Sequence, residues 1–319
     1  MELILTLDVG TTSVKACLFD RQLRQTALTS REYALQTRGV CAEVEAQVYL
    51  DAAAQCILSL PAEARARVCA VALTTQGETL LCVDRQGKAL RPAIVWLDSR
   101  AEAQAARLAA VLDRQRFYER TGLPELSGAL PLAKLLWLRE QEPESWARTD
   151  KFLLLEDYLM LWLTGRAVTE KSLLTSTGYF DLQSDDYWDE ALTLAGLDRT
   201  RLPQALACGS IVGPVLPEVA EALGLPASAC VVTGAMDQTA AALAAGCTRP
   251  GTLCETTGTA MVAAAFTAHP QFSEDHHVTI YRHAMPGAYL YLPISNTIGM
   301  SLRWFRDEFC RDKSEAKRS

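Results

Sequence analysis

The pattern of apolar and polar positions predicts a strand-rich start to the chain. Residues 3–9 form an apolar run that enters a polar turn, and residues 14–18 leave it with apolar positions alternating with a lysine and a cysteine. Such alternation is typical of a half-buried strand, so the two segments predict a hairpin. Residues 26–33 predict a third strand of the same meander, and the uncharged run 68–73 predicts a buried strand.

Helical spacing of apolar residues follows in several segments. It predicts an amphipathic helix over 44–60 and another over 101–112, capped at its start by Ser99. Further helices are predicted over residues 130–139, 152–163, 187–195, 214–223, 237–245 and 296–309. Shorter apolar runs predict strands at 80–84, 93–96, 229–233, 278–281 and 288–293, and a hairpin over 252–266. Strands and helices mixed in this way favour an α/β layered fold.

Composition narrows the class of protein. The chain has 319 residues, 49% of them hydrophobic and 22% charged, which suits one large or two ordinary globular domains. A net charge of -7 without a basic stripe argues against a nucleic-acid partner. No apolar run is long enough to cross a bilayer and no leader pattern opens the chain, so no membrane partner is expected. Ten scattered cysteines without a Cys-x-x-Cys pair predict reduced core thiols and a cytoplasmic protein.

The turn between the first two strands carries candidate chemistry. Gly10 would allow a sharp turn and the close approach of a ligand. The hydroxyls of Thr11, Thr12 and Ser13, with the N–H groups of the turn, could form a concave anion site. The Asp8 carboxylate at its mouth would repel a bare phosphate but suits a hard cation such as Mg²⁺ between the two. An ordinary hairpin with polar turn residues is the alternative.

Five short motifs occur in order along the chain. They are Asp-Val-Gly-Thr-Thr-Ser at 8–13, Gln-Gly-Glu-Thr at 76–79, Ala-Ile-Val-Trp-Leu-Asp-Ser-Arg at 93–100, Gly-Ala-Met-Asp-Gln at 234–238 and Thr-Gly-Thr at 257–259. Each is weak alone, but together they resemble the FGGY family of carbohydrate kinases, which includes xylulokinase, glycerol kinase and gluconate kinase. The resemblance covers essentially the whole chain. It implies the actin-like ATPase fold, two ribonuclease-H-like lobes with ATP in the cleft, and Mg²⁺-dependent transfer of the γ-phosphate to a sugar, polyol or sugar-acid hydroxyl.

The resemblance also implies roles for individual residues. Asp237 is implied to be the general base that accepts the proton of the substrate hydroxyl, although capping a helix is the commoner role of an aspartate at such a position. Asp8 is implied to bind the Mg²⁺ of the nucleotide, through water. The residues implied to hold the phosphates are Gly10, Thr11, Thr12, Ser13, Gly258 and Thr259.

The predicted substrate-binding residues are Gln76, Gly77, Glu78 and Asp237. Glu78 matches a family position that hydrogen-bonds substrate hydroxyls, and a charged acceptor suits polyols because each hydroxyl is a donor. Gln76 is a weaker candidate, and a solvated loop position is the alternative for Glu78. Glycerol kinases carry arginine where this chain has Gly77, and xylulokinases usually show Met-His around this position. The substrate of neither relative can therefore be transferred to this chain.

Other polar residues near the motifs are predicted to be structural. Asp98 and Arg100 are expected to form a surface pair beside the cleft, where an ion pair adds little stability. Trp96 suits a core position as well as a platform for sugar stacking. The three histidines in residues 276–283 lack tight ligand spacing and are predicted to be surface residues, not a metal site.

The resemblance divides the chain into two lobes. Residues 1–246 correspond to a complete N-terminal, sugar-binding lobe, and residues 247–319 to the beginning of a C-terminal, nucleotide-binding lobe. Family members continue past the helix predicted at 296–309, so an exposed sheet edge and an exposed apolar helix face are expected. Weak or absent ATP binding and little turnover are expected as well. A fragment, a remainder on a separate chain and a decayed gene are three explanations that stay open.

Two functions remain open from the sequence. One is an ATP-dependent kinase of a small hydroxylated substrate, and the other is a truncated, catalytically weak or inactive relative that binds a sugar. An actin-like ATPase of chaperone or cytoskeletal kind is disfavoured, because the motifs at 76–79 and 93–100 serve a small hydroxylated substrate. The particular sugar or polyol and the oligomeric state do not follow from the sequence, which allows a homodimer.

Overall fold

The fold is described for most of the chain. The structure, a computed structural model, describes residues 2–257, 261–275, 278–295 and 298–310. Two predicted site residues, Gly258 and Thr259, lie outside these ranges. Two of the histidines, His276 and His277, lie outside them as well.

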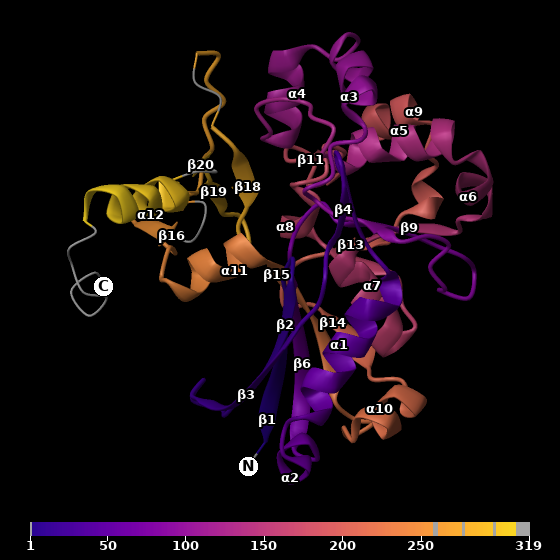
Figure 1. Cartoon of the computed structure of the whole chain (residues 1–319), viewed down its shortest axis with the longest axis vertical. Coiled ribbons are helices and arrows are strands. Elements are labelled where there is room, and N and C mark those ends of the chain that lie inside the picture. Colours follow the sequence, from indigo (N-terminus) through magenta and orange to yellow (C-terminus); the bar gives the residue numbers. More distant parts are fainter. Residues whose placement is uncertain (1, 258–260, 276–277, 296–297, 311–319) are drawn as a thin grey trace.

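The main sheet has six strands in the order β14-β15-β6-β1-β2-β3 (Figure 1). Their bounds are β1 (Leu3–Val9), β2 (Ser13–Phe19), β3 (Gln25–Glu32), β6 (Val68–Thr75), β14 (Ile211–Pro214) and β15 (Cys230–Met236). The predicted hairpin is confirmed, because β1 and β2 pair antiparallel from Ile4 opposite Phe19 to Val9 opposite Val14. In contrast, β6 runs parallel to both β1 and β15, so these three strands end at the same edge of the sheet.

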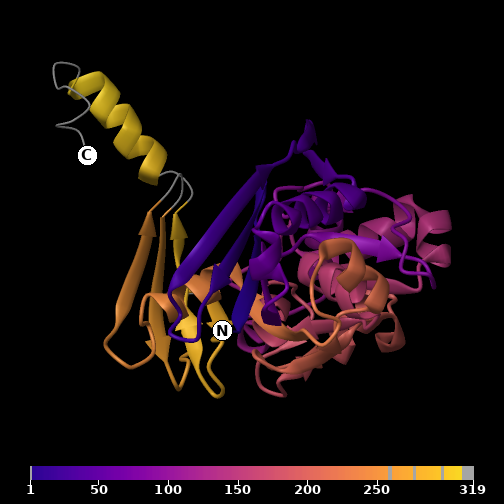
Figure 2. The same cartoon turned by 90° about the horizontal axis from the view of Figure 1, so that it is seen from below.

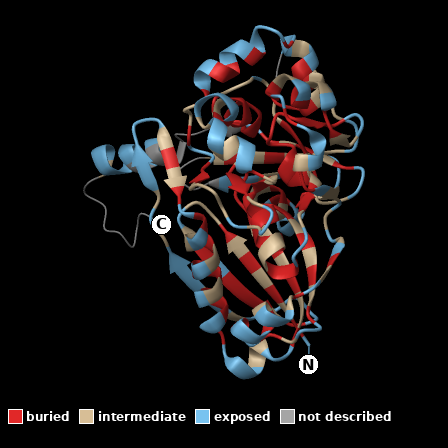
Figure 3. Cartoon of the chain, turned by 90° about the vertical axis from the view of Figure 1, so that its right-hand side faces the viewer, coloured by how far each residue is buried: buried red, intermediate tan, exposed pale blue. Residues whose placement is uncertain are grey.

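Helices cover this sheet and complete its core. Helix α1 (Ala46–Leu58), predicted over 44–60, packs on β2 and β3, whereas α7 (Leu155–Thr164) packs on β6 and β14. Every second residue of β1 is buried, so the apolar run of the sequence meets the core at alternate positions. Figure 3 shows buried residues concentrated along these strands and exposed residues on the outer helix surfaces.

A second sheet has the order β4-β5-β8-β7-β9. Its strands are β4 (Gln36–Arg38), β5 (Cys41–Val44), β7 (Leu80–Val83), β8 (Ala93–Ile94) and β9 (Lys151–Leu154). The helix predicted over 152–163 is wrong at its start, because Leu154 pairs with Leu80 in a strand and the helix begins only at Leu155. An unbroken apolar run suits a buried strand as well as a buried helix, and periodicity cannot separate the two.

The remaining helices before the last sheet pack on one another and on strands of both sheets. They are α2 (Ala62–Arg65), α3 (Glu102–Ala109), α4 (Arg114–Thr121), α5 (Pro131–Gln141), α6 (Pro143–Arg148), α8 (Lys171–Leu174), α9 (Asp189–Ala195), a 3₁₀ turn (Arg199–Arg201), α10 (Pro217–Leu223) and α11 (Asp237–Ala244). Two short ladders join β10 (Val168–Glu170) to β13 (Gln204–Leu206) and β11 (Phe180–Asp181) to β12 (Asp186–Tyr187).

The predicted cap of the helix at 101–112 by Ser99 is wrong. Ala101 precedes α3 without a side-chain cap, and the N–H of Ser99 instead donates to the Val40 carbonyl.

The last part of the chain forms a separate sheet with one projecting helix (Figure 2). Its strands, β16 (Leu253–Thr257), β17 (Met261–Thr267), β18 (Ile280–Arg282), β19 (Tyr289–Tyr291) and β20 (Ile294–Ser295), precede α12 (Ile298–Phe309). The expected apolar exposure is confirmed on α12 by Trp304, Phe305 and Phe309. On the edge strand β16, Leu253 is exposed as well, as expected.

Contacts cross the predicted lobe boundary at residue 246. The N–H of Ile280 donates to the Gly122 carbonyl at 2.8 Å, and the Tyr118 hydroxyl donates to the Val278 carbonyl at 2.8 Å. Residues from both sides of 246 also share one hydrophobic cluster. The division into residues 1–246 and 247–319 stays a prediction.

Two findings concern membrane-spanning helices and disulfides. In the described part of the chain, no helix is both long and apolar enough to span a bilayer. All ten cysteines are free, but only four of them, Cys17, Cys56, Cys82 and Cys247, are buried, so the predicted core position holds for a minority.

Candidate active site

Parallel pairing brings three polar strand ends to one edge of the main sheet. Asp8 lies opposite Thr74 in the β1–β6 pair, and Met236 lies opposite Thr75 in the β15–β6 pair. Asp237 and Gln76, which directly follow Met236 and Thr75, therefore emerge beside Asp8. Ligands of α/β proteins commonly bind at the carboxyl ends of parallel strands, so this edge is the candidate active site.

Asp237 is the first residue of α11 and is half-buried. Burial raises the pKa of its carboxyl to about 6, a hydrogen bond from the Gln238 N–H opposes the rise, and the nearby charge of Asp8 adds to it. The Gln238 N–H lies 2.6 Å from Asp237 Oδ1, and Met236, not Asp237, is the N-cap residue. A carboxylate with a pKa near neutral, in a shared site, suits general base catalysis.

Asp8 is more accessible than Asp237. Its side chain is 41% exposed and accepts from Lys15 Nζ at 3.2 Å, across the β1–β2 hairpin. An exposed pair of this kind contributes little stability, so a cation can replace Lys15 at low cost. The described residues hold no cluster of three or more His, Cys, Asp or Glu that could bind a metal by themselves. Mg²⁺ is usually held by one or two carboxylates together with phosphate oxygens, and a single accessible carboxylate fits that use.

The turn after Asp8 is fixed by its neighbours. Its Gly10 N–H donates to the Ser13 carbonyl at 3.0 Å, and the Tyr33 hydroxyl donates to the Gly10 carbonyl. Gly10 is not in the left-handed region, and a Cβ there would meet only the Ser13 carbonyl oxygen at 3.7 Å. The turn therefore does not require glycine for its backbone shape, and close approach of a ligand at Gly10 stays a prediction. Thr12 is exposed.

Trp96 joins this turn to the second sheet. Its Nε1 donates to Thr11 Oγ1 at 2.9 Å, and the residue is 37% exposed. Of the two positions left open by the sequence, a fully buried core position is therefore excluded. The indole ring stands next to the predicted phosphate turn.

Glu78 lies in an unusual backbone conformation. Its φ of 51° falls in the left-handed region, which is uncommon for residues other than glycine. Burial raises the pKa of Glu78, the charge of Lys134 opposes the rise, and the charge of Asp237 adds to it, with further opposing hydrogen bonds to Ser176 and Tyr281. Glu78 and Asp237, both proposed to contact substrate, thus lie close enough to influence each other. Strained backbone of this kind clusters at functional sites.

Lys134 contacts the backbone of this segment, and the sequence analysis assigned it no role in the site. The lysine is 0% exposed, and its Nζ donates to the carbonyls of Glu78 at 3.2 Å and Val95 at 3.0 Å. Burial lowers its pKa and the nearby Glu78 charge opposes the fall. One signal was available, a single charge inside the apolar stripe of α5. Tyr281, from β18, carried no sequence signal, because only the fold brings this strand to Glu78.

Gln76 and Gly77 are both buried, and their contacts are with other parts of the protein. Gln76 is buried, and its amide Nε2 lies 3.4 Å from the hydroxyl of Tyr49 in the core. Gly77 packs tightly, because a Cβ there would come within 3.0 Å of Ser176 Oγ and 3.3 Å of Met236 Sδ. Contact of either residue with substrate stays a prediction.

Two structural assignments need correction. The Asp98–Arg100 pair exists, with Arg100 Nη2 2.7 Å from Asp98 Oδ2, but it is buried and not on the surface. Its acid also accepts from the Ala42 N–H at 2.6 Å, because the loop must satisfy its polar groups inside the protein. His283 is buried too, with Nε2 2.9 Å from the Cys247 carbonyl oxygen, so its predicted surface position is wrong.

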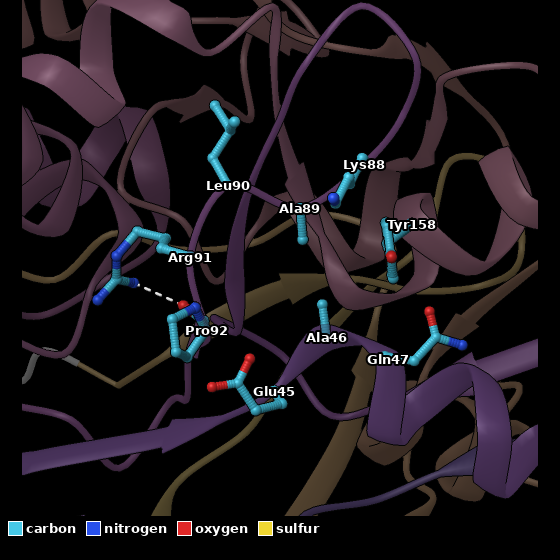
Figure 4. Close-up of a pocket in the computed structure, with 9 residues that line it drawn as sticks. All are labelled: Glu45, Ala46, Gln47, Lys88, Ala89, Leu90, Arg91, Pro92 and Tyr158. Atoms are coloured by element: carbon cyan, nitrogen blue, oxygen red, sulfur yellow. Dashed lines mark hydrogen bonds between the residues drawn. The ribbon is translucent and has the colours of Figure 1, made fainter.

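A pocket of about 350 Å³ lies elsewhere, between the start of α1 and the loop before β8 (Figure 4). Its lining residues are Glu45, Ala46, Gln47, Lys88, Ala89, Leu90, Arg91, Pro92 and Tyr158. None of the predicted site residues lines it. The guanidinium of Arg91 is committed to Glu43 and Glu142, so it is not a free charge for a ligand.

Comparisons with known proteins find similar sequences and similar folds. The model of the FGGY family of carbohydrate kinases, N-terminal domain, matches residues 3–244. The chain is 30% identical over 314 residues to a xylulose kinase of Lactococcus lactis, covering 97% of this chain and 62% of that protein. It is 27% identical over 321 residues to a gluconokinase of Bacillus subtilis, covering 98% of this chain and 61% of that protein.

Among solved structures, the xylulose kinase from Rhodospirillum rubrum superposes with a TM-score of 0.92 at 28% identity, covering 99% of this chain and 65% of that one. The match shows the actin-like ATPase fold that the sequence motifs implied. The chain spans about three-fifths of the length of the curated relatives that it matches. With a family match over most of its length, the chain belongs to the FGGY family of carbohydrate kinases.

Proposed function

We propose that this protein catalyses ATP-dependent phosphorylation of a hydroxyl group on a sugar, polyol or sugar acid. The observation that supports it most is the convergence of three carboxylates, Asp8, Glu78 and Asp237, at one sheet edge: the Asp237 charge adds to the raised pKa of Glu78, and the Asp8 charge adds to the raised pKa of Asp237. Relatives named xylulose kinase and gluconokinase act, by their names, on a sugar and a sugar acid, which favours a substrate of that class.

In the proposed reaction, Glu78 orients the substrate by accepting hydrogen bonds from its hydroxyls. Asp237 removes the proton from the reacting hydroxyl, and the resulting oxygen attacks the γ-phosphorus as the bond to ADP breaks. Mg²⁺ held by Asp8 would neutralise the charge that develops on the phosphate oxygens. The turn of Gly10, Thr11, Thr12 and Ser13 would hold the phosphates, with Gly258 and Thr259 proposed on the opposite side.

The test is ADP release by this chain with Mg²⁺, ATP and a panel of ketoses, polyols and sugar acids. We expect slow release with at least one compound, in line with the little turnover expected from the sequence, and a fall of a hundredfold or more for Asp237→Asn, because a positioned base contributes roughly that factor. Asp51→Asn, which changes an exposed aspartate of α1, is the matched control and keeps wild-type turnover.

Two results would contradict the proposal. Undiminished turnover of Asp237→Asn would remove the assigned base. No ADP release with any compound, while sugars still raise the melting temperature, would favour the alternative function, a sugar-binding relative without turnover.

A further inference from the structure

The backbone just before Asp237 is held by side chains from two helices. The pairing of β15 with β6 is interrupted between Val232 and Ala235. At this interruption, the Gly234 N–H donates to Glu156 Oε1 of α7 at 3.1 Å. Two residues further on, the Met236 N–H donates to Ser172 Oγ of α8 at 3.1 Å. The residue that follows is Asp237.

Ser172 is fixed by a third side chain. Glu170, at the end of β10, accepts from the Ser172 hydroxyl and from the Ser172 and Leu173 N–H groups, the last two at 2.8 and 3.2 Å. Because the Ser172 hydroxyl donates to Glu170, its lone pairs are left to accept from Met236. Glu156, Glu170 and Ser172 are all buried. Buried polar groups specify one arrangement when their hydrogen bonds are satisfied, as those of the Ser172 hydroxyl are with Glu170 and Met236.

We propose that Glu156, Ser172 and Glu170 are positioning residues that hold the backbone from Gly234 to Met236 and thereby set the place of the Asp237 carboxylate. The inference rests on the proposed role of Asp237 as general base. None of the three is proposed to touch the reacting atoms, since Glu156 and Ser172 contact the main chain behind the site and Glu170 acts through Ser172. A displacement of about 1 Å at a catalytic group can lower turnover a hundredfold.

The protonation of Glu156 decides which variants test the inference. Burial and the charge of Glu170 raise the pKa of Glu156 well above its usual range, and its Oε2 has no hydrogen-bond partner among the described residues. A neutral acid still accepts the Gly234 N–H through Oε1, and so does the amide oxygen of glutamine. Glu156→Gln is therefore the conservative variant, and Glu156→Ala is the disruptive one.

The experiment compares Ser172→Ala and Glu156→Ala with three controls. Ser172→Thr and Glu156→Gln keep the acceptor, and Thr164→Val removes a buried hydroxyl of α7 that bonds only within its own helix end. We expect kcat to fall tenfold to a hundredfold in the two disruptive variants while KM for the sugar changes less than threefold. All three controls keep kcat within threefold of wild type, even where their melting temperatures fall.

A second readout needs no turnover. The ¹H–¹⁵N resonances of Asp237 and Gln238 are expected to move in Ser172→Ala and to stay in place in Ser172→Thr and Thr164→Val. Unmoved resonances in Ser172→Ala, or an equal loss of kcat in Thr164→Val, would overturn the inference. If the wild-type chain phosphorylates nothing, the proposed function fails, and the resonances alone decide whether Ser172 positions Asp237.

Discussion

Glu78 and Asp237 oppose each other as charges in the candidate active site. Burial is the main cause of both raised pKa values; the Asp237 charge adds to the rise at Glu78, and the Asp8 charge adds to the rise at Asp237. The charge of Lys134 opposes the rise at Glu78. At the residue scale the site therefore holds carboxyl groups whose pKa values are raised toward neutral pH, which suits the proposed general base.

Asp237 makes the reaction depend on pH. With a pKa of about 6, its carboxylate is protonated at lower pH and cannot accept the substrate proton. We expect kcat/KM to rise about tenfold per pH unit below pH 6 and to level off above it. Initial rates from pH 4.5 to 8 measure this profile. A profile without an ascending limb near pH 6, in protein that stays folded, would contradict the assignment.

Lys134 links the segment of Glu78 to that of Val95. Replacing it by methionine leaves two buried carbonyls without their donor, and each unsatisfied group costs about 1–3 kcal/mol. We expect Lys134→Met to lower the free energy of unfolding by about 2 kcal/mol or more in urea and to weaken the sugar-dependent thermal shift. The exposed lysine variant Lys88→Met serves as control and should match wild type in both measurements. Equal behaviour of the two variants would show that Lys134 does not support the site.

At the scale of elements, the approach of β15 to β6 depends on one glycine. A Cβ on Gly234 would lie 1.4 Å from the Leu73 carbonyl oxygen, so no side chain fits without separating the strands. The interruption in the β15–β6 register falls at the same place. This close approach brings the end of β15, and so Asp237, beside the end of β6.

Alanine variants of Gly234 and Gly10 test two different roles of glycine, close strand packing at Gly234 and ligand approach at Gly10. Gly234→Ala should lower the free energy of unfolding by more than about 3 kcal/mol, because backbone must move. Gly10→Ala meets only ordinary contact and should change stability by less than about 1 kcal/mol. If Gly10 serves a nucleotide, Gly10→Ala loses ATP-dependent turnover while remaining folded. Denaturant unfolding and ADP release measure the two effects, and wild-type stability of Gly234→Ala would contradict the packing.

For the whole molecule, buried acids make stability depend on pH. Burial raises the pKa of Asp157 to about 8 and that of Glu170 to about 7, and it raises that of Glu156 well above the usual range. Between pH 5 and 7 the folded state therefore holds protons that the unfolded state has lost. Stability falls as pH rises through this window. The lowered pKa of Lys134, about 7, works in the opposite direction only at higher pH.

We expect the free energy of unfolding to fall by at least about 2 kcal/mol from pH 5 to pH 7, since one pKa unit in one group is worth about 1.4 kcal/mol. Urea unfolding at several pH values measures it. Asp157→Asn keeps an acceptor for the Leu154 N–H but no longer titrates, so its slope should be shallower. Stability that rises over this range, or an unchanged slope in the variant, would count against protonated acids in the core.

The sequence by itself determined the local elements and the family. Apolar or uncharged runs predicted β1 and β6, alternation predicted β2 and the continuing meander predicted β3, and five ordered motifs pointed to the carboxylates of the candidate site. Local pattern failed where an apolar run suits two structures, as at β9, and where burial depends on distant segments, as for His283 and the Asp98–Arg100 pair. Only the tertiary structure decided that Lys134 and Tyr281 reach Glu78 and that Glu156 and Ser172 hold the backbone before Asp237. Such contacts join segments far apart in the chain, and their geometry follows from how the sheets and helices pack, which no local pattern contains.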